Sequence, residues 1–461
     1  MKFKTNAIIG LIFLGLLGFV YFYEIKGGEQ RRQEAEKSKQ LLDFKDTEVQ
    51  RIELVRGDTT VVLDKGTDGW RLSAPVSDGA SQDAVERYLR NLGESEREKT
   101  VVDSASATAS QAAKYGLDTP RLKIALGLEG GAEHAVAFGT DSPTDRFTYV
   151  QKQGGNPEIF VVRAWRFDNL DKGVFDLRDR RVLAFAKDDV VEVRRAGLGG
   201  DVVLAREGEA WQLREPLTAL ADAEVVKSLL NKIDTAEIES FVAEAPDAEA
   251  LKTYGLGGQT GVEIALLIGP DRAEKRLAIG VDNGQGRFYA RDASRPQVFL
   301  VDSTVVQQLT KGLDELRDKK PLRFDRGSVE HIALIKNESQ IFAVEKDTAG
   351  VWSLTNPADR ETKSWKLNGL LTDLGQLEVA GFAAKLPQAA AEILGIELAG
   401  GGQPLLSVRI SQAEGTLYLQ AEGDASVYVV SADDFSALDL GLDDVAQAPK
   451  APIPVNGAGD G

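Results

Sequence analysis

The stretch that decides the fold of this chain is WRLSAP at residues 70–75, because the chain uses its pattern three times. The pattern is Trp-x-Leu-x-x-Pro, and it returns as WQLREP at 211–216 and as WSLTNP at 352–357. The step from Trp70 to Trp211, and from Trp211 to Trp352, is 141 residues. A repeat of this length is a domain rather than one turn of a solenoid, so we predict three copies of one folded unit.

Other landmarks return at nearly the same step. They are Phe44, Phe185 and Phe324; Tyr-Gly-Leu at 115–117, again at 254–256 and more loosely as Leu-Gly-Ile at 394–396; Tyr149, Tyr289 and Tyr428; and Leu-Arg-Asp at 177–179 and 316–318. The seams therefore fall near residues 184 and 323. The predicted units are residues 44–184, 185–323 and 324–447, called repeats 1, 2 and 3 below.

The first part of each repeat is predicted to be a group of strands. Apolar and polar residues alternate from 49 to 55, which is typical of a half-buried strand. Two more strands are expected at 59–63 and 70–72, separated by glycine-containing turns. Pro75 ends the third strand, since proline cannot donate to a ladder.

A helix is expected next, because apolar residues fall 15, 18, 19 and 22 positions after each repeated Trp. These residues are Val85, Tyr88, Leu89 and Leu92 in repeat 1, Val226, Leu229, Leu230 and Ile233 in repeat 2, and Leu367, Leu370, Leu371 and Leu374 in repeat 3. More strands are expected at 122–128, 135–138, 147–151 and 159–162, then a helical segment at about 164–180. Short connections between strands imply antiparallel pairing, so the class is α+β with antiparallel sheets.

Composition excludes several classes of protein. A chain of 461 residues is long enough for roughly three domains. Its net charge of -17 repels phosphate backbones, which argues against nucleic acid as a partner. With no cysteine, the chain has no disulfide, thiolate-bound zinc or iron–sulfur cluster. Its two histidines, His134 and His331, lie far apart in sequence.

The N-terminal region predicts membrane attachment. Residues 7–23, AIIGLIFLGLLGFVYFY, form an uncharged apolar run whose helix would be about 25 Å long, near the lower limit for crossing a bilayer. A cleaved signal peptide and a buried core helix are the alternatives, but no small-x-small cleavage site follows the run. We expect a cytoplasmic tip and a single transmembrane anchor over 1–26, with the bulk of the chain extracytoplasmic.

The residues that flank the repeats have their own character. Residues 27–43 are highly charged and helix-forming, so they are expected to form a solvated stalk. Residues 448–461, rich in Pro and Gly, are expected to be a disordered tail.

Candidate chemical groups each have a simpler structural interpretation. The repeated Trp could bind a sugar ring, but Trp and Leu two residues apart on a strand also suit a core. His331 shares its repeat position with Arg51 and Glu192, and His134 shares its position with Lys275, which indicates solvent-facing places rather than a general base. The string DNGQG at 282–286 lacks the spacing of a calcium loop and is typical of a hairpin turn.

The carboxylate pairs at 188–189, 433–434 and 443–444 also lack calcium-loop spacing. The basic strings LRDRR at 177–181 and LRDKK at 316–320 lie at the seams. There they could contact acidic residues of the next repeat or form a docking surface. No catalytic, cofactor-binding or metal-binding residue is therefore predicted.

These features resemble a family of bacterial membrane-anchored proteins of unknown function, DUF4340. The resemblance rests on the anchor with YFYE at 21–24, GWRLSAP at 69–75, YGLD at 115–118 and FDLRD at 175–179. Repeat 3 departs most, since it has Leu-Gly-Ile at 394–396 and no Leu-Arg-Asp. The resemblance implies an accessory to an exporter of the gliding-motility ABC type or to another envelope assembly.

From the sequence we therefore expect an extracytoplasmic scaffold or interaction protein at the inner membrane, without enzymatic activity. Its partner would be a membrane transporter or envelope protein. A module that binds envelope glycan or an exported substrate is the second hypothesis. A carboxylate-based hydrolase is the third.

Overall fold

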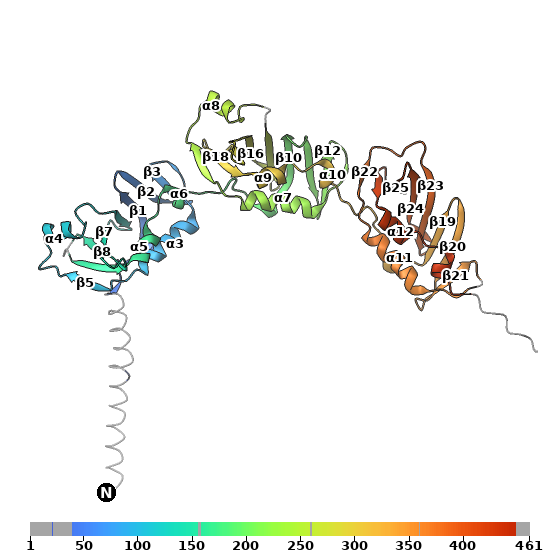
Figure 1. Ribbon diagram of the computed structural model, residues 1–461, viewed down its shortest axis with the longest axis horizontal. Helices are drawn as coiled ribbons and strands as arrows, with labels where there is room; N and C mark the ends of the chain where they lie inside the picture. Colours follow the sequence, from blue (N-terminus) through green and yellow to red (C-terminus); the bar gives the residue numbers. More distant parts are fainter. Residues whose placement is uncertain (1–20, 22–38, 155–157, 259–260, 359, 449–461) are drawn as a thin grey trace, which may run out of the picture. The chain divides into compact units, whose positions relative to one another are not determined.

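The computed structural model describes residues 21, 39–154, 158–258, 261–358 and 360–448 (Figure 1). Apart from Tyr21, the predicted anchor lies outside these residues, as do the stalk up to residue 38 and the tail from residue 449. Within the described part of the chain, no helix combines the length and apolar character needed to span a bilayer.

Repeat 1 builds one nine-stranded antiparallel sheet in the order β4-β3-β2-β1-β6-β7-β8-β9-β5. Its strands are β1 (Val49–Arg56), β2 (Thr59–Gly66), β3 (Gly69–Ala74), β4 (Asp78–Gly79), β5 (Lys99–Val102), β6 (Leu122–Leu128), β7 (Glu133–Asp141), β8 (Phe147–Gln153) and β9 (Ile159–Arg163). Its helices are η2 (Asp46–Glu48), α3 (Gln82–Gly93), α4 (Ala109–Lys114), α5 (Ala164–Leu170) and α6 (Val174–Leu177). The strands before the long helix (β1–β4) and those after it (β5–β9) are joined where β1 pairs with β6, so one sheet contains both groups.

Repeat 2 follows the same plan, with the sheet order β13-β12-β11-β10-β15-β16-β17-β18-β14. Its strands are β10 (Val190–Gly197), β11 (Val202–Glu207), β12 (Ala210–Glu215), β13 (Ala219–Leu220), β14 (Ser240–Ala243), β15 (Val262–Ile268), β16 (Ala273–Asp282), β17 (Arg287–Asp292) and β18 (Val298–Asp302). Its helices are η3 (Lys187–Asp189), α7 (Ala223–Thr235), α8 (Ala248–Thr253), α9 (Ser303–Leu309) and α10 (Leu313–Leu316). In Figure 1, α7 and α9 lie on one face of this sheet.

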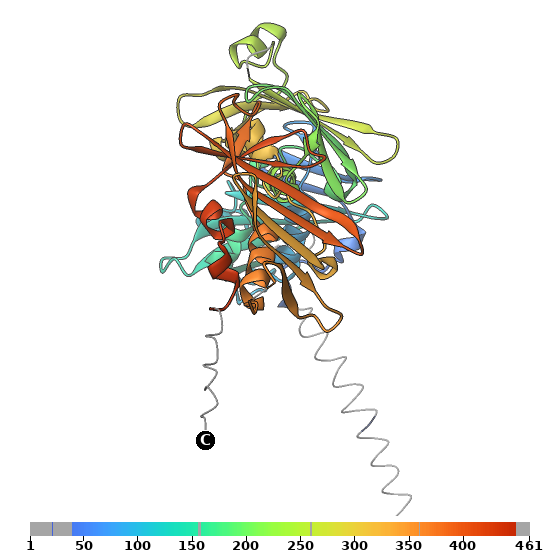
Figure 2. The ribbon, with the colours of Figure 1, turned by 90° about the vertical axis from the view of Figure 1, so that its right-hand side faces the viewer.

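Repeat 3 has an eight-stranded sheet in the order β21-β20-β19-β23-β24-β25-β26-β22. Its strands are β19 (His331–Lys336), β20 (Ser339–Lys346), β21 (Trp352–Asn356), β22 (Gly381–Ala383), β23 (Ala391–Gly400), β24 (Gln403–Ala413), β25 (Thr416–Ala421) and β26 (Val427–Val430). Its helices are η4 (Arg326–Ser328), α11 (Ser364–Gln376), α12 (Ala432–Leu438) and α13 (Leu442–Val445). Figure 2 shows α11 (orange) and α12 (red) together on one side of the sheet. The predicted α+β class with antiparallel sheets is confirmed for all three sheets.

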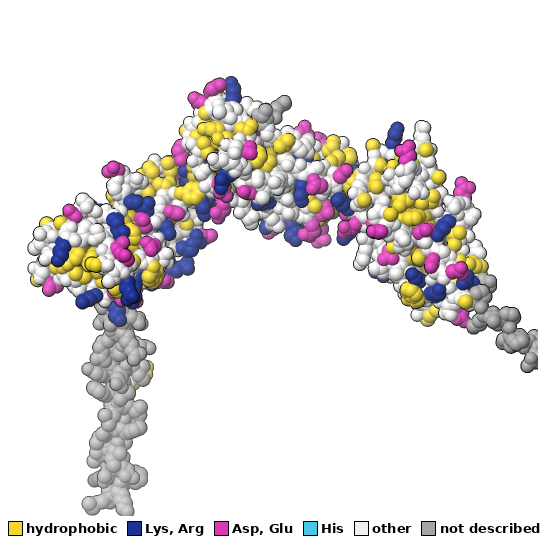
Figure 3. Space-filling model, viewed as in Figure 1, with side chains coloured by type: hydrophobic (Ala, Val, Ile, Leu, Met, Phe, Trp, Pro, Cys, Tyr) yellow, Lys and Arg dark blue, Asp and Glu magenta, His cyan; other side chains and the backbone are white. Residues whose placement is uncertain are grey.

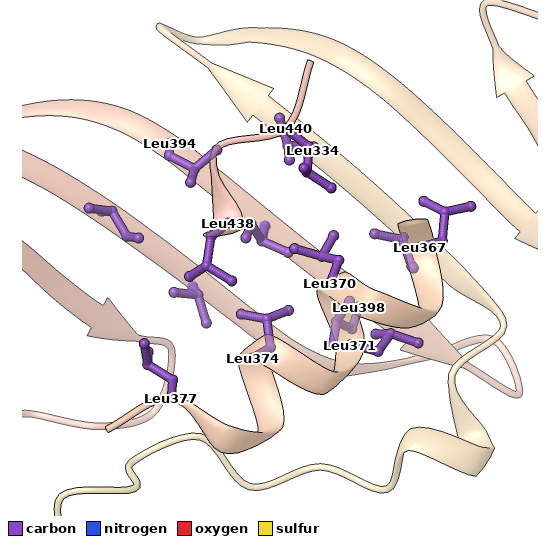
Figure 4. Close-up of a cluster of buried hydrophobic side chains, with 14 of the residues drawn as sticks. Leu334, Leu367, Leu370, Leu371, Leu374, Leu377, Leu394, Leu398, Leu438 and Leu440 are labelled. Carbon is purple, nitrogen blue, oxygen red and sulfur yellow. The ribbon is translucent and has the colours of Figure 1, made fainter. Parts of the chain in front are cut away.

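The core of each repeat lies between the sheet and its long helix. All four predicted stripe residues are buried in α3, in α7 and in α11. In repeat 3 the α11 leucines face Leu334 of β19 and Leu398 of β23 (Figure 4). An amphipathic helix laid over a sheet removes both apolar faces from water, and that burial is the main source of stability.

The Tyr-Gly-Leu turn of repeats 1 and 2 holds a short helix over the opposite face of the sheet. Gly116 follows α4 with φ +70, a left-handed conformation that favours glycine. Tyr115 then stacks on Tyr149 of β8, with ring centroids 4.4 Å apart. In repeat 2, Tyr254 and Tyr289 repeat this contact at 4.7 Å.

Two landmark correspondences in repeat 3 were wrong. Leu-Gly-Ile at 394–396 lies inside β23, where Ile396 pairs with Leu334, so it matches the start of β6 rather than a turn. Tyr428 lies in β26 and pairs with Leu419, which places it where Phe160 and Phe299 lie in the other repeats. The counterpart of Tyr149 and Tyr289 is Tyr418 of β25. The reason is that repeat 3 is shorter between α11 and β23, so a constant step misaligns its second half.

The end of the predicted stalk is also different from the expectation. Leu41 and Leu42 are buried in the core of repeat 1. The Leu41 amide donates to the Ser95 carbonyl at 2.7 Å, and Gln40 forms an isolated β-bridge with Glu96. Two adjacent leucines gain more from burial than from the solvated helix that their charged neighbours favour.

By their contacts the described residues group into two compact bodies. The first contains the chain up to Arg181 together with Glu237–Glu244, the segment that carries β14. The second contains Val182–Ala236 and the chain from Ala245 onward.

Candidate functional site

The repeated tryptophans are core residues. Trp70, Trp211 and Trp352 are 5%, 8% and 1% exposed, respectively. The Trp352 indole nitrogen donates to Asn368 of α11 at 3.2 Å, which satisfies its buried N–H. They therefore do not line a sugar-binding groove.

The two histidines occupy the strand positions that the repeat comparison predicted. His134 pairs with Leu126 and Lys275 pairs with Leu266, which confirms their shared place. His331 lies opposite Glu345, as Arg51 lies opposite Asp64. No group of three or more His, Asp and Glu side chains arranged to hold a metal ion occurs among the residues that the structure describes.

The string DNGQG at 282–286 forms the turn between β16 and β17, as predicted. The Asp282 carboxylate accepts hydrogen bonds from the amides of Gly284 and Gly286, at 2.9 and 3.1 Å. The Asn283 side chain accepts from Gln285 in the same way. These oxygens stabilise a turn.

The face of each sheet away from the long helix, called the open face below, is covered only in part by α4 in repeat 1 and by α8 in repeat 2. It carries a different charged group at its centre in each repeat. In repeat 1, Arg51 donates to Asp64 at 2.7 Å. In repeat 2 the matching residue is Glu192, which accepts from Arg194 at 2.6 Å and from Arg272 at 2.5 Å. The prediction of a solvent-facing place is correct for Arg51 but wrong for Glu192, whose side chain is only 10% exposed because two arginines cover it.

Electrostatics at this position follow from those contacts. Burial alone would raise the pKa of Glu192, but hydrogen bonds from Arg272 and Arg194 outweigh burial and hold the pKa below its ordinary value. Repeat 3 instead places His331 beside a cavity of about 640 Å³. The cavity is lined by acidic side chains that include Glu345 and Glu422.

The basic strings at the seams contact acidic residues of the next repeat, as predicted. Arg180 pairs with Glu237 at 2.8 Å, and Lys320 pairs with Glu378 at 3.1 Å. The most buried of these contacts involves Arg178. Its Nη atoms donate to both carboxylate oxygens of Glu244, at 2.8 and 2.7 Å.

In the first junction, formed by Arg178, Asp78, Phe241 and Glu244, each of the three side-chain nitrogens of the arginine donates a hydrogen bond to a carboxylate. The Arg178 Nε donates to Asp78 at 2.6 Å, and the guanidinium lies 3.3 Å from the centroid of the Phe241 ring. Burial disfavours the charge on Arg178, but the hydrogen bonds to Glu244 and Asp78 outweigh it and raise the pKa. A planar cation between an aromatic face and two carboxylates is a strong and directional contact.

The second junction, formed by Arg317 and Phe382, repeats the stacking but not the ion pairs. The backbone of Arg317 forms an isolated β-bridge with Ala221, as that of Arg178 does with Ala80. The Arg317 guanidinium lies 3.5 Å from the centroid of the Phe382 ring. In repeat 3 the matching β-bridge joins Ala446 to Thr362, so an alanine stands where the other repeats have an arginine.

All three repeats share one backbone hydrogen bond, at the place where the segment before the repeat contacts it. The Ile238 amide donates to the Arg180 carbonyl at 2.7 Å, and the Val379 amide donates to the Lys319 carbonyl at 2.9 Å. In repeat 1 the Arg97 amide donates to the Lys39 carbonyl at 2.7 Å. The segment that contains residues 39–42 therefore contacts repeat 1 in the same way that the end of one repeat contacts the next repeat.

Sequence reasoning found the seam arginines as a basic string but missed their separate roles. The signal was present in the repeat alignment, where Asp78 and Glu244 of the first junction have Ala219 and Lys385 as counterparts in the second. It also missed Arg195, which replaces the core residue Leu54. The buried Arg195 donates to four backbone carbonyls, those of Gly199, Gly200, Leu309 and Lys311.

Comparison with solved structures gives one distant similarity. A DNA polymerase sliding clamp from Pseudomonas aeruginosa, crystallised with a ligand, is similar with a TM-score of 0.13 and 9% identity. The comparison covers 86% of this chain and 94% of the clamp. A similarity of that size carries no conclusion about fold or function. None of the curated proteins compared with the chain matches it.

Comparison with protein families gives a match in the same register as the repeats. The family described as a domain of unknown function, DUF4340, matches residues 70–257 and again residues 211–395. The two matches start at Trp70 and Trp211 and together cover more than half of the chain. This chain therefore belongs to the DUF4340 family.

Proposed function

We propose that this chain is an extracytoplasmic scaffold or interaction protein that is held at the inner membrane by residues 7–23. Its partner would be an ABC-type transporter or another envelope complex. The apolar run and the resemblance described above support the membrane location and the class of partner. The proposal assigns the repeats to recognition rather than to chemistry.

The observation that carries the proposal is a contrast between the two faces of the repeated sheet. The helix-covered face keeps the same buried skeleton in all three repeats. The centre of the open face changes from an Arg51–Asp64 pair to Glu192 under two arginines and then to His331 opposite Glu345. A constant framework with a varied polar face suits the recognition of a partner that differs along its length.

The ionisation of the carboxylates supports a role without catalysis. A general acid needs a carboxyl whose pKa is raised toward neutrality. Glu192 and Asp141 have the opposite shift, since hydrogen bonds from arginines outweigh burial and lower the pKa of each. Figure 3 shows acidic and basic side chains interspersed on the visible face, which suits many paired surface charges.

Affinity purification of the full-length protein from solubilised membranes tests the proposal. We expect a membrane protein to be recovered with it in stoichiometric amount. Replacing both Arg51 and Asp64 by Ala should reduce that recovery, whereas replacing the exposed pair of Lys45, just before η2, and Glu48, within η2, by Ala should not. Recovery of the protein alone would contradict the proposal.

A reporter enzyme that is active only outside the cytoplasm tests the orientation when fused to the C-terminus. We expect reporter activity in cells and recovery of the fusion in the membrane fraction. An inactive fusion that is nevertheless stable would overturn the extracytoplasmic assignment.

The cavity beside His331 favours one second candidate, a module that binds envelope glycan or an exported substrate. A cavity of about 640 Å³ is in the size range of small-ligand sites. Sedimentation with peptidoglycan or polysaccharide separates this candidate from the scaffold. Binding that is lost in a His331→Ala variant would favour the module.

A further inference from the structure

The second junction contains a buried cation without a hydrogen-bonded anion. Arg317 is 9% exposed, and its Nε atom is fully buried. None of its side-chain nitrogens donates a hydrogen bond to a residue that the structure describes. The nearest carboxylate oxygen, on Asp314, lies 4.0 Å from Nη1 on a side chain that is 62% exposed. Asp424 and Tyr428 also attract the charge of Arg317, but neither accepts a hydrogen bond from it. A buried guanidinium in this state is costly, because it has lost water and gained no hydrogen-bonded partner.

The first junction shows what such an arginine binds. Arg178 occupies the same place in repeat 1, stacks on Phe241 as Arg317 stacks on Phe382, and holds Glu244 with both Nη atoms. Glu244 lies three residues after Phe241. The residue three positions after Phe382 is Lys385, which has the opposite charge.

The second carboxylate that binds the arginine in the first junction, that of Asp78, also has no counterpart in the second junction. Asp78 binds the Nε of Arg178, and its counterpart beside Arg317 is Ala219 of β13. Both carboxylates that neutralise the arginine in one copy are therefore replaced in the other. Burial lowers the pKa of Arg317, against the attraction of Asp314, Tyr428 and Asp424, whereas the pKa of Arg178 is raised.

In the first junction, the place of the carboxylate that pairs with the arginine is partly open to solvent. The Glu244 side chain, which marks that place in the first junction, is 47% exposed although Arg178 itself is 3% exposed. Lys385 is exposed and follows Phe382 by three residues, as Glu244 follows Phe241. By this equivalence, an anion bound to the Nη atoms of Arg317 would lie at a partly exposed place, as Glu244 does beside Arg178.

We propose that the second junction is a carboxylate-binding site, in which the Nη atoms of Arg317 hold a carboxylate that does not come from this repeat pair. The carboxylate takes the position that Glu244 has at Arg178, with Phe382 below the guanidinium and Lys385 beside it. The proposal does not depend on the proposed function. It assigns the ligand by chemistry, because fork-to-fork pairing with a carboxylate is the geometry that the matching arginine already shows.

Amide hydrogen exchange on the full-length protein tests the site locally. At constant ionic strength, replacing chloride by acetate should slow exchange in residues 378–386, about twofold when the acetate concentration equals its Kd. Arg317→Met should remove this effect. Lys385→Glu should also remove it, because the chain then supplies its own carboxylate and residues 378–386 are protected without acetate.

Two controls make the result specific. Arg409→Met, at an exposed arginine of the same repeat, should keep the acetate effect. Glu244→Gln should create an acetate effect in residues 237–244, which the wild-type protein lacks. If acetate slows exchange equally in the wild type and in the Arg317→Met variant, or in neither, the proposal is wrong.

A second arm identifies the source of the carboxylate. A short peptide with blocked ends and one glutamate replaces acetate in the same measurement. A stronger effect of the peptide assigns the ligand to a polypeptide side chain, and an equal effect assigns it to free carboxylates. An effect of either probe that depends on Arg317 supports the site.

Discussion

Arg178 and Arg317 occupy the same place in consecutive repeats, and the residues around them decide what each can do. Arg178 pairs with two carboxylates through all three of its side-chain nitrogens, so it forms a structural ion pair. Arg317 keeps the aromatic contact but has neither carboxylate. Only a side-by-side comparison of two copies shows this difference, because each string reads simply as Leu-Arg-Asp.

Replacing Arg178 by Met tests the buried pair at this scale. We expect the first body to lose about 3–5 kcal/mol in its free energy of unfolding, since Asp78 is left buried without its cation. Arg181→Met, at a side chain that is 61% exposed, should change that free energy by less than about 0.5 kcal/mol. Denaturant unfolding of both variants makes the comparison, and equal losses would show that Arg178 has no special role.

Tyr428 predicts a dependence of stability on alkaline pH. Burial and the hydrogen bond from its hydroxyl to Asp424 raise the pKa of Tyr428 to about 12. The unfolded value is about 10, so the folded state holds the proton more tightly. This contribution is fully present below pH 10 and is lost as the pH rises toward 12. Tyr428→Phe should lack that part of the pH dependence, and identical profiles for variant and wild type would refute the assignment.

At the residue scale the sequence predicted packing better than polar detail. The Trp and the helix stripe could be predicted, because their spacing reports directly on burial. The covering of Glu192 could not, because Arg272 comes from the turn between β15 and β16, 80 residues away in the chain. Such long-range polar contacts leave no local pattern.

At the scale of elements, residues 39–42 act as the first docking segment of the array. Their backbone hydrogen bond from Arg97 to Lys39 matches those made at the entries to repeats 2 and 3. Leu41 and Leu42 are 0% and 3% exposed. Residues 39–42, near the end of the predicted stalk, are therefore part of the fold of repeat 1.

Replacing Leu41 by Ala tests this docking. A fully buried leucine in a packed core should cost about 2–5 kcal/mol when truncated to alanine. Leu198→Ala, at a leucine that is 56% exposed, is the matched control and should cost much less. Unfolding monitored by exchange in residues 82–102 reports on repeat 1 specifically. An equal, small effect of both changes would mean that residues 39–42 do not dock.

The order of elements could be predicted for repeats 1 and 2 but only in part for repeat 3. A constant spacing of about 140 residues between repeats correctly predicts the elements in the first half of repeat 3, from Phe324 to α11. The second half lacks the short helix and its Tyr-Gly-Leu turn, so β23 begins earlier than the step predicts. The string Leu-Gly-Ile fits a turn or a strand equally well, and only the pairing of β23 with β19 decides between them.

At the scale of the whole molecule, the repeated residues and the varied residues have separate roles. The repeated Trp, Leu and Pro residues build the cores, while the open faces and the second junction remain for partners. The buried tryptophans are central to this account, because a Trp that lined an open groove would return the repeats to a binding or catalytic role.

Quenching of tryptophan fluorescence by acrylamide tests that division most directly. The chain has five tryptophans, so variants that each keep one Trp and replace the other four by Phe separate their signals. We predict that Trp70, Trp211 and Trp352 resist quenching, whereas Trp165 and Trp365, which are 51% and 67% exposed, are quenched readily. If any of the three repeated tryptophans is quenched as readily as Trp365 in a folded variant, the account is contradicted.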